Sequence, residues 1–411
     1  MPTLADSMFI LADDLSGAAD CAIAAARAGL KSVVLFEPDI HVQAEVVAVD
    51  ADTRQRPAQE AAATNRALWK AQSAPKRLFY KKIDSTLRGN FAAEMAALTE
   101  AGVAIVAPAY PATGRITRNG KVWVKGVPLE QTEVWANERM TGEADIVQIL
   151  CGQGVPAVNV PLAGVRGDLR AELTRLVSDL QIKAIVCDAE EDSDLARIAV
   201  ASMGLPVYWV GSAGLAAHLP GAAKLEGHTA MPRLAVTGAI VTVVGSLSAV
   251  SRQQAEILEA GATLEVFVPS PEVLRAGEAD SRWQALRAGV GQALHEGRDV
   301  LIRTGLEEIN DLRQGHVLCD SLRRLLTPFA SEIGALIATG GETARALLPA
   351  FGASALQLVR EIEPGVPLSV AIGPRSIAVV TKAGAFGSAN ALLACYAALS
   401  AARAEAQTGS I

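Results

Sequence analysis

The chain has 411 residues, half of them hydrophobic but only 4% aromatic, and a formal net charge of −7 at pH 7. Since one hydrophobic core stops growing at roughly 250 to 300 residues, we expect two domains. The acidic balance argues against a nucleic-acid or anionic-membrane partner, because either would need a broad basic surface. No apolar run approaches the ~20 residues that cross a bilayer and no secretory leader is apparent, so we expect a cytoplasmic protein without a membrane span.

Short apolar runs alternate with Ala-rich helical stretches through the first half of the chain. Strands are expected at 8–12, 32–36, 46–49, 77–81, 104–107, 157–160, 184–187 and 207–210, and helices at 18–29, 58–71 and 91–101. This rhythm is typical of βαβ units, whose strands form a parallel sheet. We therefore predict an α/β domain with a mainly parallel sheet over residues 1–225.

The pattern lapses between residues 220 and 238, where glycine, proline and polar residues replace the periodic runs. We place a linker at 226–238. A second α/β series follows, with strands expected at 240–244, 263–268, 299–303, 335–338 and 376–380 and helices at 251–260 and 389–402. We predict that residues 239–411 form a second domain, again with a mainly parallel sheet.

Acidic and basic side chains follow three of the expected strands in the first domain. Asp13 and Asp14 follow one strand, Arg54 follows another, and the stretch 81–90 (KKIDSTLRGN) follows a third. Arg and Lys bind carboxylates or phosphates, whereas Asp accepts hydrogen bonds from hydroxyls. Because open α/β sheets bind ligands at the carboxyl ends of their strands, we predict a site for a small, acidic, hydroxylated substrate. The alternatives are a helix cap at one aspartate or Ser16, and isolated surface ion pairs elsewhere.

Within the segment 108–128, Gly114, Gly120 and Lys121 approach the pattern of a nucleotide-binding P-loop. The spacing is one residue too long, and Val122 stands where a magnesium-binding Ser or Thr is needed. A β-hairpin that turns at Asn119 and Gly120 fits better. A dinucleotide oxidoreductase is also disfavoured, because no G-x-G-x-x-G pattern follows a strand with an acid at the proper distance.

Three strand-to-helix turns in the second half combine glycines with hydroxyl or lysine side chains. Their sequences are VVGSLS at 243–248, TGGETA at 339–344 and KAGAFGS at 382–388. Exposed backbone amides at such turns can hold a phosphate, although Glu342 or Thr343 could instead cap the following helix. One such turn is a weak signal, but three in one domain favour a nucleotide site. An acid-binding half beside a phosphate-binding half indicates a kinase that uses Mg²⁺.

The segments ADDLSGA, ADTR, KKIDSTLRGN, PAYPATGR, VVGSLS, TGGETA, EPGVPL and KAGAFG occur in the order seen in the four-carbon acid sugar kinase family. The chain resembles this family over essentially its whole length. The resemblance implies ATP-dependent phosphorylation of the 4-hydroxyl of D-threonate or D-erythronate, with 3-oxo-tetronate as the alternative substrate. It implies a sugar-acid-binding N-terminal domain and an ATP-binding C-terminal domain. A non-catalytic sensor that binds the same ligands is the alternative from another class, and a homodimer is our expectation for the assembly.

Carried over to this sequence, the resemblance assigns residues to both ligands. The substrate would be bound by Asp13, Asp14, Arg54, Lys82, Asp84, Ser85 and Arg88, and ATP by Ser246, Ser248, Gly340, Gly341, Glu342, Thr343, Gly384 and Gly387. The metal ligands stay unassigned.

We expect Arg88, helped by Arg54 or Lys82, to hold the substrate carboxylate, because a planar guanidinium matches its two oxygens. Asp14 is the first choice for the catalytic base and Asp84 the second. Two positions depart from the family pattern. Ser16 stands where Thr is usual, and Gln131 lies where a His-Glu-Thr sequence is common, which leaves the role of the loop 128–133 and the choice of substrate open.

Overall fold

The computed structural model describes residues 5–37, 40, 42–138, 142–227, 232, 234–246, 248–305, 315–384 and 386–408. The chain divides into two compact units, Met1–Val34 with His41–Thr229 and Leu35–Ile40 with Ala230–Ile411. The predicted linker 226–238 lies partly outside the described residues, and its limits stay a prediction. None of the described helices is long and apolar enough to span a membrane.

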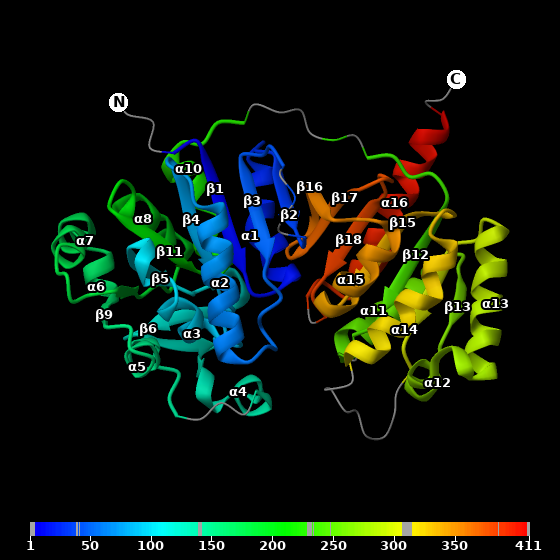
Figure 1. The fold of residues 1–411 in the computed structure, drawn as a ribbon, viewed down its shortest axis with the longest axis horizontal. Coiled ribbons are helices and arrows are strands. Elements are labelled where there is room, and N and C mark those ends of the chain that lie inside the picture. Colours follow the sequence, from blue (N-terminus) through cyan, green and yellow to red (C-terminus); the bar gives the residue numbers. More distant parts are fainter. Residues whose placement is uncertain are drawn as a thin grey trace. The chain divides into compact units, whose positions relative to one another are not determined.

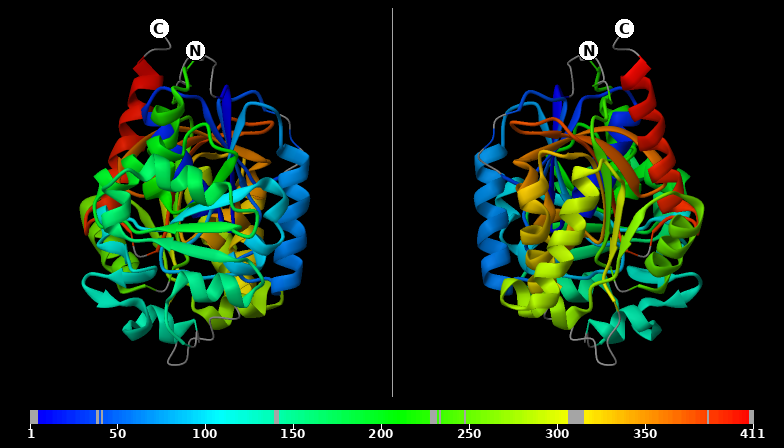
Figure 2. Two further views of the ribbon diagram at one scale, coloured as in Figure 1. Left: turned by 90° about the vertical axis from the view of Figure 1, so that its left-hand side faces the viewer. Right: turned by 90° about the vertical axis from the view of Figure 1, so that its right-hand side faces the viewer.

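The first unit is built on a parallel sheet with the strand order β2-β3-β1-β4-β11-β5-β10-β9 (Figure 1). Its strands are β1 (Ser7–Ala12), β2 (Ser32–Leu35), β3 (Val46–Asp50), β4 (Arg77–Lys82), β5 (Val103–Ala107), β9 (Ala157–Val160), β10 (Ala184–Cys187) and β11 (Val207–Gly211). The central strands are buried along nearly their whole length, as expected for parallel strands covered on both faces. Figure 2 shows helices on both sides of these strands.

The helices of the first unit connect these parallel strands. They are α1 (Leu15–Arg27), α2 (Ala58–Gln72), α3 (Phe91–Ala96), α4 (Glu133–Asn137), α5 (Ile146–Gly152), α6 (Leu162–Val165), α7 (Leu169–Val177), α8 (Asp192–Ser202), α9 (Ala213–Ala216) and α10 (Leu219–Ala223). The helix expected at 91–101 is α3 followed by the short 3₁₀ turn Thr99–Ala101. A hydrophobic core that includes Phe91, Met95 and Tyr208 fixes α3 against the sheet.

The predicted hairpin is confirmed. The antiparallel strands β6 (Arg115–Arg118) and β7 (Lys121–Val124) pair so that Arg118 lies opposite Lys121, and β8 (Val127–Pro128) extends them to a small sheet. Asn119 and Gly120 have φ values of 52° and 72°. Two consecutive positive φ values are typical of the tight hairpin turn that Asn-Gly favours.

The second unit has the strand order β13-β14-β12-β15-β18-β17-β16. Its strands are β12 (Ala239–Val244), β13 (Glu265–Phe267), β14 (Val300–Arg303), β15 (Ile333–Thr339), β16 (Ala355–Glu363), β17 (Val366–Ile372) and β18 (Ala378–Lys382). The pairs from β13 to β18 are parallel, whereas β17 runs antiparallel to both β16 and β18. The prediction of two α/β domains with mainly parallel sheets is therefore confirmed, although the antiparallel pair β16–β17 was not predicted.

The helices of this unit are α11 (Ala249–Gly261), α12 (Pro271–Ala276), α13 (Ser281–His295), α14 (Gly315–Leu326), α15 (Gly341–Leu347) and α16 (Ala391–Thr408). Helices α11 and α16 pack together against the sheet and share its core through Leu258, Leu392 and Leu399. Helices α11 and α15 begin directly after β12 and β15, so the turns that precede them lie at the carboxyl edge of the sheet.

Candidate functional site

The polar side chains of the first unit lie at the carboxyl ends of three neighbouring strands. β1 lies between β3 and β4 and is parallel to both, so the residues that follow these strands meet at one edge of the sheet. Asp14 is the N-cap of α1 and accepts a hydrogen bond from Gly17 N at 3.0 Å. The capping interpretation therefore holds for Asp14, while Asp13 is buried and turns to other partners.

Arg54 binds both aspartates through its whole guanidinium. Its Nε and Nη2 donate to Asp13 at 2.7 and 2.9 Å, and its Nη1 and Nη2 donate to Asp14 at 2.9 and 2.8 Å. Burial opposes the charge on Asp13, but Arg54 and Lys82 outweigh it and lower the pKa of Asp13. Burial likewise opposes the charge on Arg54, but the aspartates raise its pKa. Arg54 thus compensates the negative charge of two carboxylates.

Asp84 joins Arg54 to a second arginine. Its Oδ2 accepts from Arg88 Nη2 at 2.7 Å and lies 3.8 Å from Arg54 Nη2, while its Oδ1 accepts from Thr86 N at 2.8 Å. Burial raises the pKa of Asp84, but Arg88 and Arg54 outweigh it and hold that pKa well below its usual range. Asp84 is consequently ionised and paired. The Arg88 side chain keeps 38% of its surface exposed, against 17% for Arg54.

The two lysines of the stretch 81–90 point in opposite directions, because successive side chains of a strand alternate between its faces. Lys82 lies on the α1 side, where a Cβ added to Gly17 would come 2.5 Å from its Nζ. Burial lowers the pKa of Lys82, but Asp14 and Asp13 outweigh it and raise that pKa. Lys81 instead lies 2.9 Å from Glu94 of α3, with both side chains almost wholly buried. The view of the whole stretch as one anion-binding cluster is therefore wrong for Lys81.

A buried polar network holds the loop that carries Arg54. Thr53 donates its hydroxyl to Glu94, whose other carboxyl oxygen pairs with Lys81. Asn90 donates to the carbonyl of Thr53 at 3.0 Å, and Thr53 N donates to Asp13 O at 3.0 Å. These bonds fix Thr53 on both sides, so they also fix the direction in which the neighbouring Arg54 leaves the backbone.

Ser85 leads to an arginine that the sequence prediction missed. Arg115, at the start of β6, donates from Nη1 to Ser85 Oγ at 3.0 Å. Burial lowers the pKa of Arg115, and Asp84 opposes that shift. Within the described part of the chain, the Nε atoms of Arg88 and Arg115 are buried without a hydrogen-bond partner. These two donors suit an anionic ligand. The sequence feature that could have indicated Arg115 as a site residue is its position in the PAYPATGR segment.

The three glycine turns of the second unit are neighbours because β12, β15 and β18 are adjacent parallel strands. A Cβ added to Gly384 would lie 2.2 Å from Ser246 Oγ, and one added to Gly245 would lie 2.2 Å from Thr343 Oγ1. Gly340 has a φ of 95°, which favours glycine. The predicted residues of the three turns thus gather at one edge of the sheet, where small side chains let the backbones approach closely.

The side chains at the second and first turns have different roles. Gly340 is the N-cap of α15 and no side chain caps this helix, so the capping alternative for Glu342 and Thr343 is wrong. Glu342 is exposed, whereas Thr343 is buried near Cys319. Ser248 caps α11 by accepting from Ser251 N at 3.1 Å and also donates to Gly384 O at 2.9 Å. Ser248 therefore ties the first turn to the third.

The third turn has two further partners that the sequence prediction did not assign. Lys382 Nζ donates to the carbonyl oxygens of Ala383, Gly384 and Phe386 at 3.0 to 3.1 Å. Gln254 Nε2 donates to carbonyl oxygens of residues 386 to 388. Lys382 belongs to the third glycine motif, but the sequence did not show which way its side chain points. Gln254 belongs to no motif, and only its position in the expected helix 251–260 was predicted.

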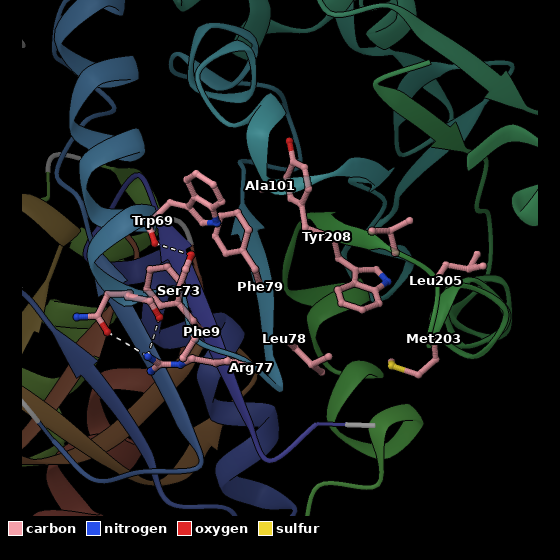
Figure 3. A pocket seen from close by; sticks show the side chains of 15 residues that line it. Phe9, Trp69, Ser73, Arg77, Leu78, Phe79, Ala101, Met203, Leu205 and Tyr208 are labelled. Carbon is pink, nitrogen blue, oxygen red and sulfur yellow. Dashed lines mark hydrogen bonds between the residues drawn. The ribbon is translucent and has the colours of Figure 1, made fainter. Parts of the chain in front are cut away.

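An aromatic cavity lies at the opposite, amino-terminal edge of the first sheet (Figure 3). It has a volume of about 290 Å³. Phe79 stacks between Phe9 and Tyr208, with ring centroids 5.5 and 5.3 Å apart, and Trp69 completes the lining. The Arg77 guanidinium lies 5.4 Å from the centroid of Phe9 and also bonds the carbonyl of Gln72. None of the predicted site residues lines this cavity.

Both units match known protein domains. Residues 8–219 match the model of a sugar-binding N-terminal domain, and residues 241–392 match that of a nucleotide-binding C-terminal domain. A D-threonate kinase of Cupriavidus necator is 45% identical, with 97% of this chain and 99% of the relative covered. A D-threonate kinase of Bordetella bronchiseptica is 35% identical, covering 93% and 95%. A 3-oxo-tetronate kinase of Pseudomonas savastanoi is 28% identical, covering 92% and 94%.

A solved structure supports the same fold. A Salmonella typhimurium protein superposes with a TM-score of 0.79 and 22% identity, with 95% of this chain and 98% of the other covered. The expected resemblance is thus confirmed along the whole chain. With a sugar-binding domain, a nucleotide-binding domain and kinases among its full-length relatives, the chain belongs to the four-carbon acid sugar kinase family.

Proposed function

We propose that the protein is a D-threonate kinase, which transfers the terminal phosphoryl group of ATP to the 4-hydroxyl of D-threonate and releases ADP. The observation that carries this proposal is the 45% identity to a relative of that name over 97% of the chain. The relative named 3-oxo-tetronate kinase is 28% identical, which makes 3-oxo-tetronate the less favoured substrate. D-erythronate, which differs from D-threonate in the configuration of one hydroxyl, stays the second candidate.

Arg88 is our proposed ligand of the substrate carboxylate, and Arg115 its proposed helper. Support comes from the exposure of Arg88 and from the buried, unpaired Nε donors of both arginines among the described residues. A carboxylate would accept bonds from such donors in a charge-assisted, bidentate manner. In this proposal Arg54 and Lys82 keep Asp13 ionised, Arg54 also holds Asp14 in place, and Ser85 and Asp84 bind the hydroxyls of the substrate.

Asp14 is the proposed base for the 4-hydroxyl, with Asp84 as the alternative. The base takes the hydroxyl proton while the hydroxyl oxygen bonds to the γ-phosphorus and the bond to the departing ADP oxygen breaks. Exposure supports this order: 24% of the Asp14 side chain is accessible, against 11% for Asp84, which is also tied to Arg88.

ATP is proposed to bind at the three glycine turns of the second domain, through Ser246, Ser248, Gly340 to Thr343, Gly384 and Gly387. Mg²⁺ is commonly held by one or two carboxylates and the substrate phosphates rather than by a protein-only cage. Glu342 fits this pattern, because it is a carboxylate exposed at the second glycine turn. Glu342 would be the carboxylate ligand, and Mg²⁺ would neutralise phosphate charge.

A coupled ADP-release assay with D-threonate, D-erythronate and 3-oxo-tetronate tests the proposal. We expect the highest kcat/KM for D-threonate and little ADP release without an acid. Tight binding of acid and ATP without acid-dependent ADP release would instead show the non-catalytic sensor. The expected homodimer and cytoplasmic location are separate proposals, which analytical ultracentrifugation and cell fractionation would test.

A further inference from the structure

The carbonyl oxygens of the third glycine turn point toward donors inside the second domain. Lys382 Nζ donates to Ala383 O at 3.0 Å and to Phe386 O at 3.0 Å. Gly384 O accepts from Lys382 Nζ at 3.1 Å and from the hydroxyls of Ser248 and Ser251 at 2.9 and 2.7 Å. Clustered carbonyl oxygens commonly surround a cation, and here the cation is the ammonium group of Lys382.

Gln254 reinforces this arrangement from α11. Its Nε2 donates to Phe386 O at 3.1 Å, to Gly387 O at 3.4 Å and to Ser388 O at 2.7 Å. Both Gln254 and Lys382 are buried, with exposures of 0% and 1%. The donors therefore lie beneath the turn rather than at its outer surface.

The direction of these carbonyls determines the direction of the turn's N–H groups. In a planar trans peptide, the C=O and the following N–H point in opposite directions, and the described residues contain no cis peptide bond. The N–H of Gly384 therefore points away from Lys382, because Ala383 O points toward it. The same argument applies to the N–H of Gly387, because Phe386 O accepts from both Lys382 and Gln254.

We infer that Lys382 and Gln254 are positioning residues, which hold the carbonyls of Ala383, Gly384 and residues 386–388 inward so that the Gly384 and Gly387 amides face outward to bind the nucleotide phosphates. Neither side chain touches the nucleotide in this arrangement. The inference rests on the proposed ATP site and adds the residues that shape it. It predicts that replacing Lys382 or Gln254 changes the affinity for ATP and leaves the affinity for the acid unchanged.

The charge on Lys382 adds a pH dependence. Burial lowers the pKa of Lys382 to about 8, and the nearby carboxylate of Glu363 on β16 opposes this shift only in part. Burial raises the pKa of the Cys395 thiol to about 12, so this thiol stays neutral around pH 8. Lys382 is thus charged below pH 8 and loses its charge as the pH rises through that value. Its hold on the carbonyls weakens in the same direction.

The first test compares Gln254→Leu with Gln253→Leu, its exposed neighbour on α11. Because lost hydrogen bonds cost about 1 kcal/mol each and 1.4 kcal/mol is tenfold, we expect Gln254→Leu to raise the KM for ATP about tenfold. The KM for D-threonate should stay within about twofold in both variants. An unchanged KM for ATP in a folded Gln254→Leu protein, or equal losses for both substrates, would overturn the inference.

The second test follows the KM for ATP of the native enzyme and of Lys382→Met from pH 7.5 to 9.5. Phosphate groups with a second pKa of about 6 stay ionised over this range. We expect the KM for ATP to rise with pH in the native enzyme and to be high and pH-independent in Lys382→Met. Equal pH dependence in both proteins would contradict the inference. If the native enzyme shows no acid-dependent ADP release, the proposed function fails, and direct ATP-binding titrations of the same proteins then decide the inference alone.

Discussion

Arg54 and Arg88 carry the same charge but differ in their hydrogen-bond partners and in their exposure. The guanidinium nitrogens of Arg54 donate to Asp13 and Asp14, so Arg54 contributes only indirectly to the binding of an acid substrate. Arg88 bonds Asp84 through Nη2 and keeps more than a third of its side chain exposed. Arg54 therefore holds the two carboxylates in place, and Arg88 is the arginine that we propose for the substrate anion.

Replacing Arg88 by Met should therefore weaken acid binding and leave ATP binding unchanged. A hydrogen bond to a charged group contributes about 1.5–3 kcal/mol, so the KM for D-threonate should rise roughly 10- to 100-fold. Arg118→Met is the matched control, because Arg118 is a half-exposed arginine of the same domain, at the end of the hairpin strand β6, and pairs with Glu190. Steady-state kinetics with each substrate varied would measure both effects. A KM for D-threonate that is no higher than in Arg118→Met would contradict the assignment of Arg88.

Asp14→Asn should lower kcat with little effect on the KM for either substrate. Asn can still cap α1, but the change removes the proton acceptor and one of the two oxygens that accept from Arg54. Loss of a general base typically costs 10²- to 10⁴-fold, and we expect a decrease of about this size. Asp84→Asn is the comparison, and its main effect should be on the KM for the acid, because Asp84 pairs with Arg88. Normal turnover by Asp14→Asn would show that the base lies elsewhere.

The sequence identified the residue types of the site but not all of their directions. Asp13, Asp14, Arg54 and Asp84 form one bonded group, which recurrence at three strand ends indicated. The stretch 81–90 also contains Lys81, which was not assigned to the site and which pairs with Glu94 instead. Arg115 was missed because its partner Ser85 lies 30 residues away, and no local pattern reports such a contact.

At the scale of elements, the buried pair of Lys81 on β4 and Glu94 on α3 joins the sheet to the helix beneath the site. Removing one partner leaves the other charge buried and unpaired, which typically costs 3–5 kcal/mol. We expect Lys81→Met to lower the free energy of unfolding of the first domain by roughly 3–5 kcal/mol in urea. The double variant Lys81→Met with Glu94→Leu should recover much of this loss, because no charge is then left buried without a partner. Equal stability of the native protein and Lys81→Met would refute this account.

The glycine turns of the second domain depend on close backbone approach. Gly384→Ala would place a Cβ 2.2 Å from Ser246 Oγ and 3.0 Å from Ser246 Cβ, so Ser246 or the third turn must shift. We expect the KM for ATP to rise at least about tenfold, with the KM for the acid unchanged. Gly221→Ala on α10 is the control, since nothing lies within 4 Å of the added Cβ. An ATP affinity equal to that of this control would mean that the approach of the two turns is not needed for binding.

Parallel strands were easier to predict than the antiparallel pair. The strands β12, β15 and β18 are continuous apolar runs that end at glycine turns, so both their positions and their shared edge followed from the sequence. Strands β16 and β17 were missed because β16 mixes apolar residues with charged ones such as Arg360 and Glu363, and its burial is correspondingly uneven. Their pairing became visible only in the folded sheet.

At the scale of the whole molecule, length and composition predicted two α/β domains, and the order of motifs predicted the family. The two domains carry chemically distinct sites, one of paired acidic and basic side chains and one of glycine turns with inward-facing carbonyls. This division matches the two substrates of a sugar-acid kinase. The choice between D-threonate and D-erythronate depends on the configuration of a single hydroxyl group, which neither composition nor strand-end chemistry determines.

The most direct test of the proposed activity is ADP release by the full-length protein with ATP, Mg²⁺ and each acid in turn. We predict acid-dependent ADP release with the highest kcat/KM for D-threonate, together with formation of its 4-phosphate, detected by mass spectrometry. No release with any of the three acids, from a folded protein that binds ATP, would contradict the kinase assignment. A higher kcat/KM for D-erythronate or 3-oxo-tetronate would keep the kinase chemistry and contradict the choice of D-threonate.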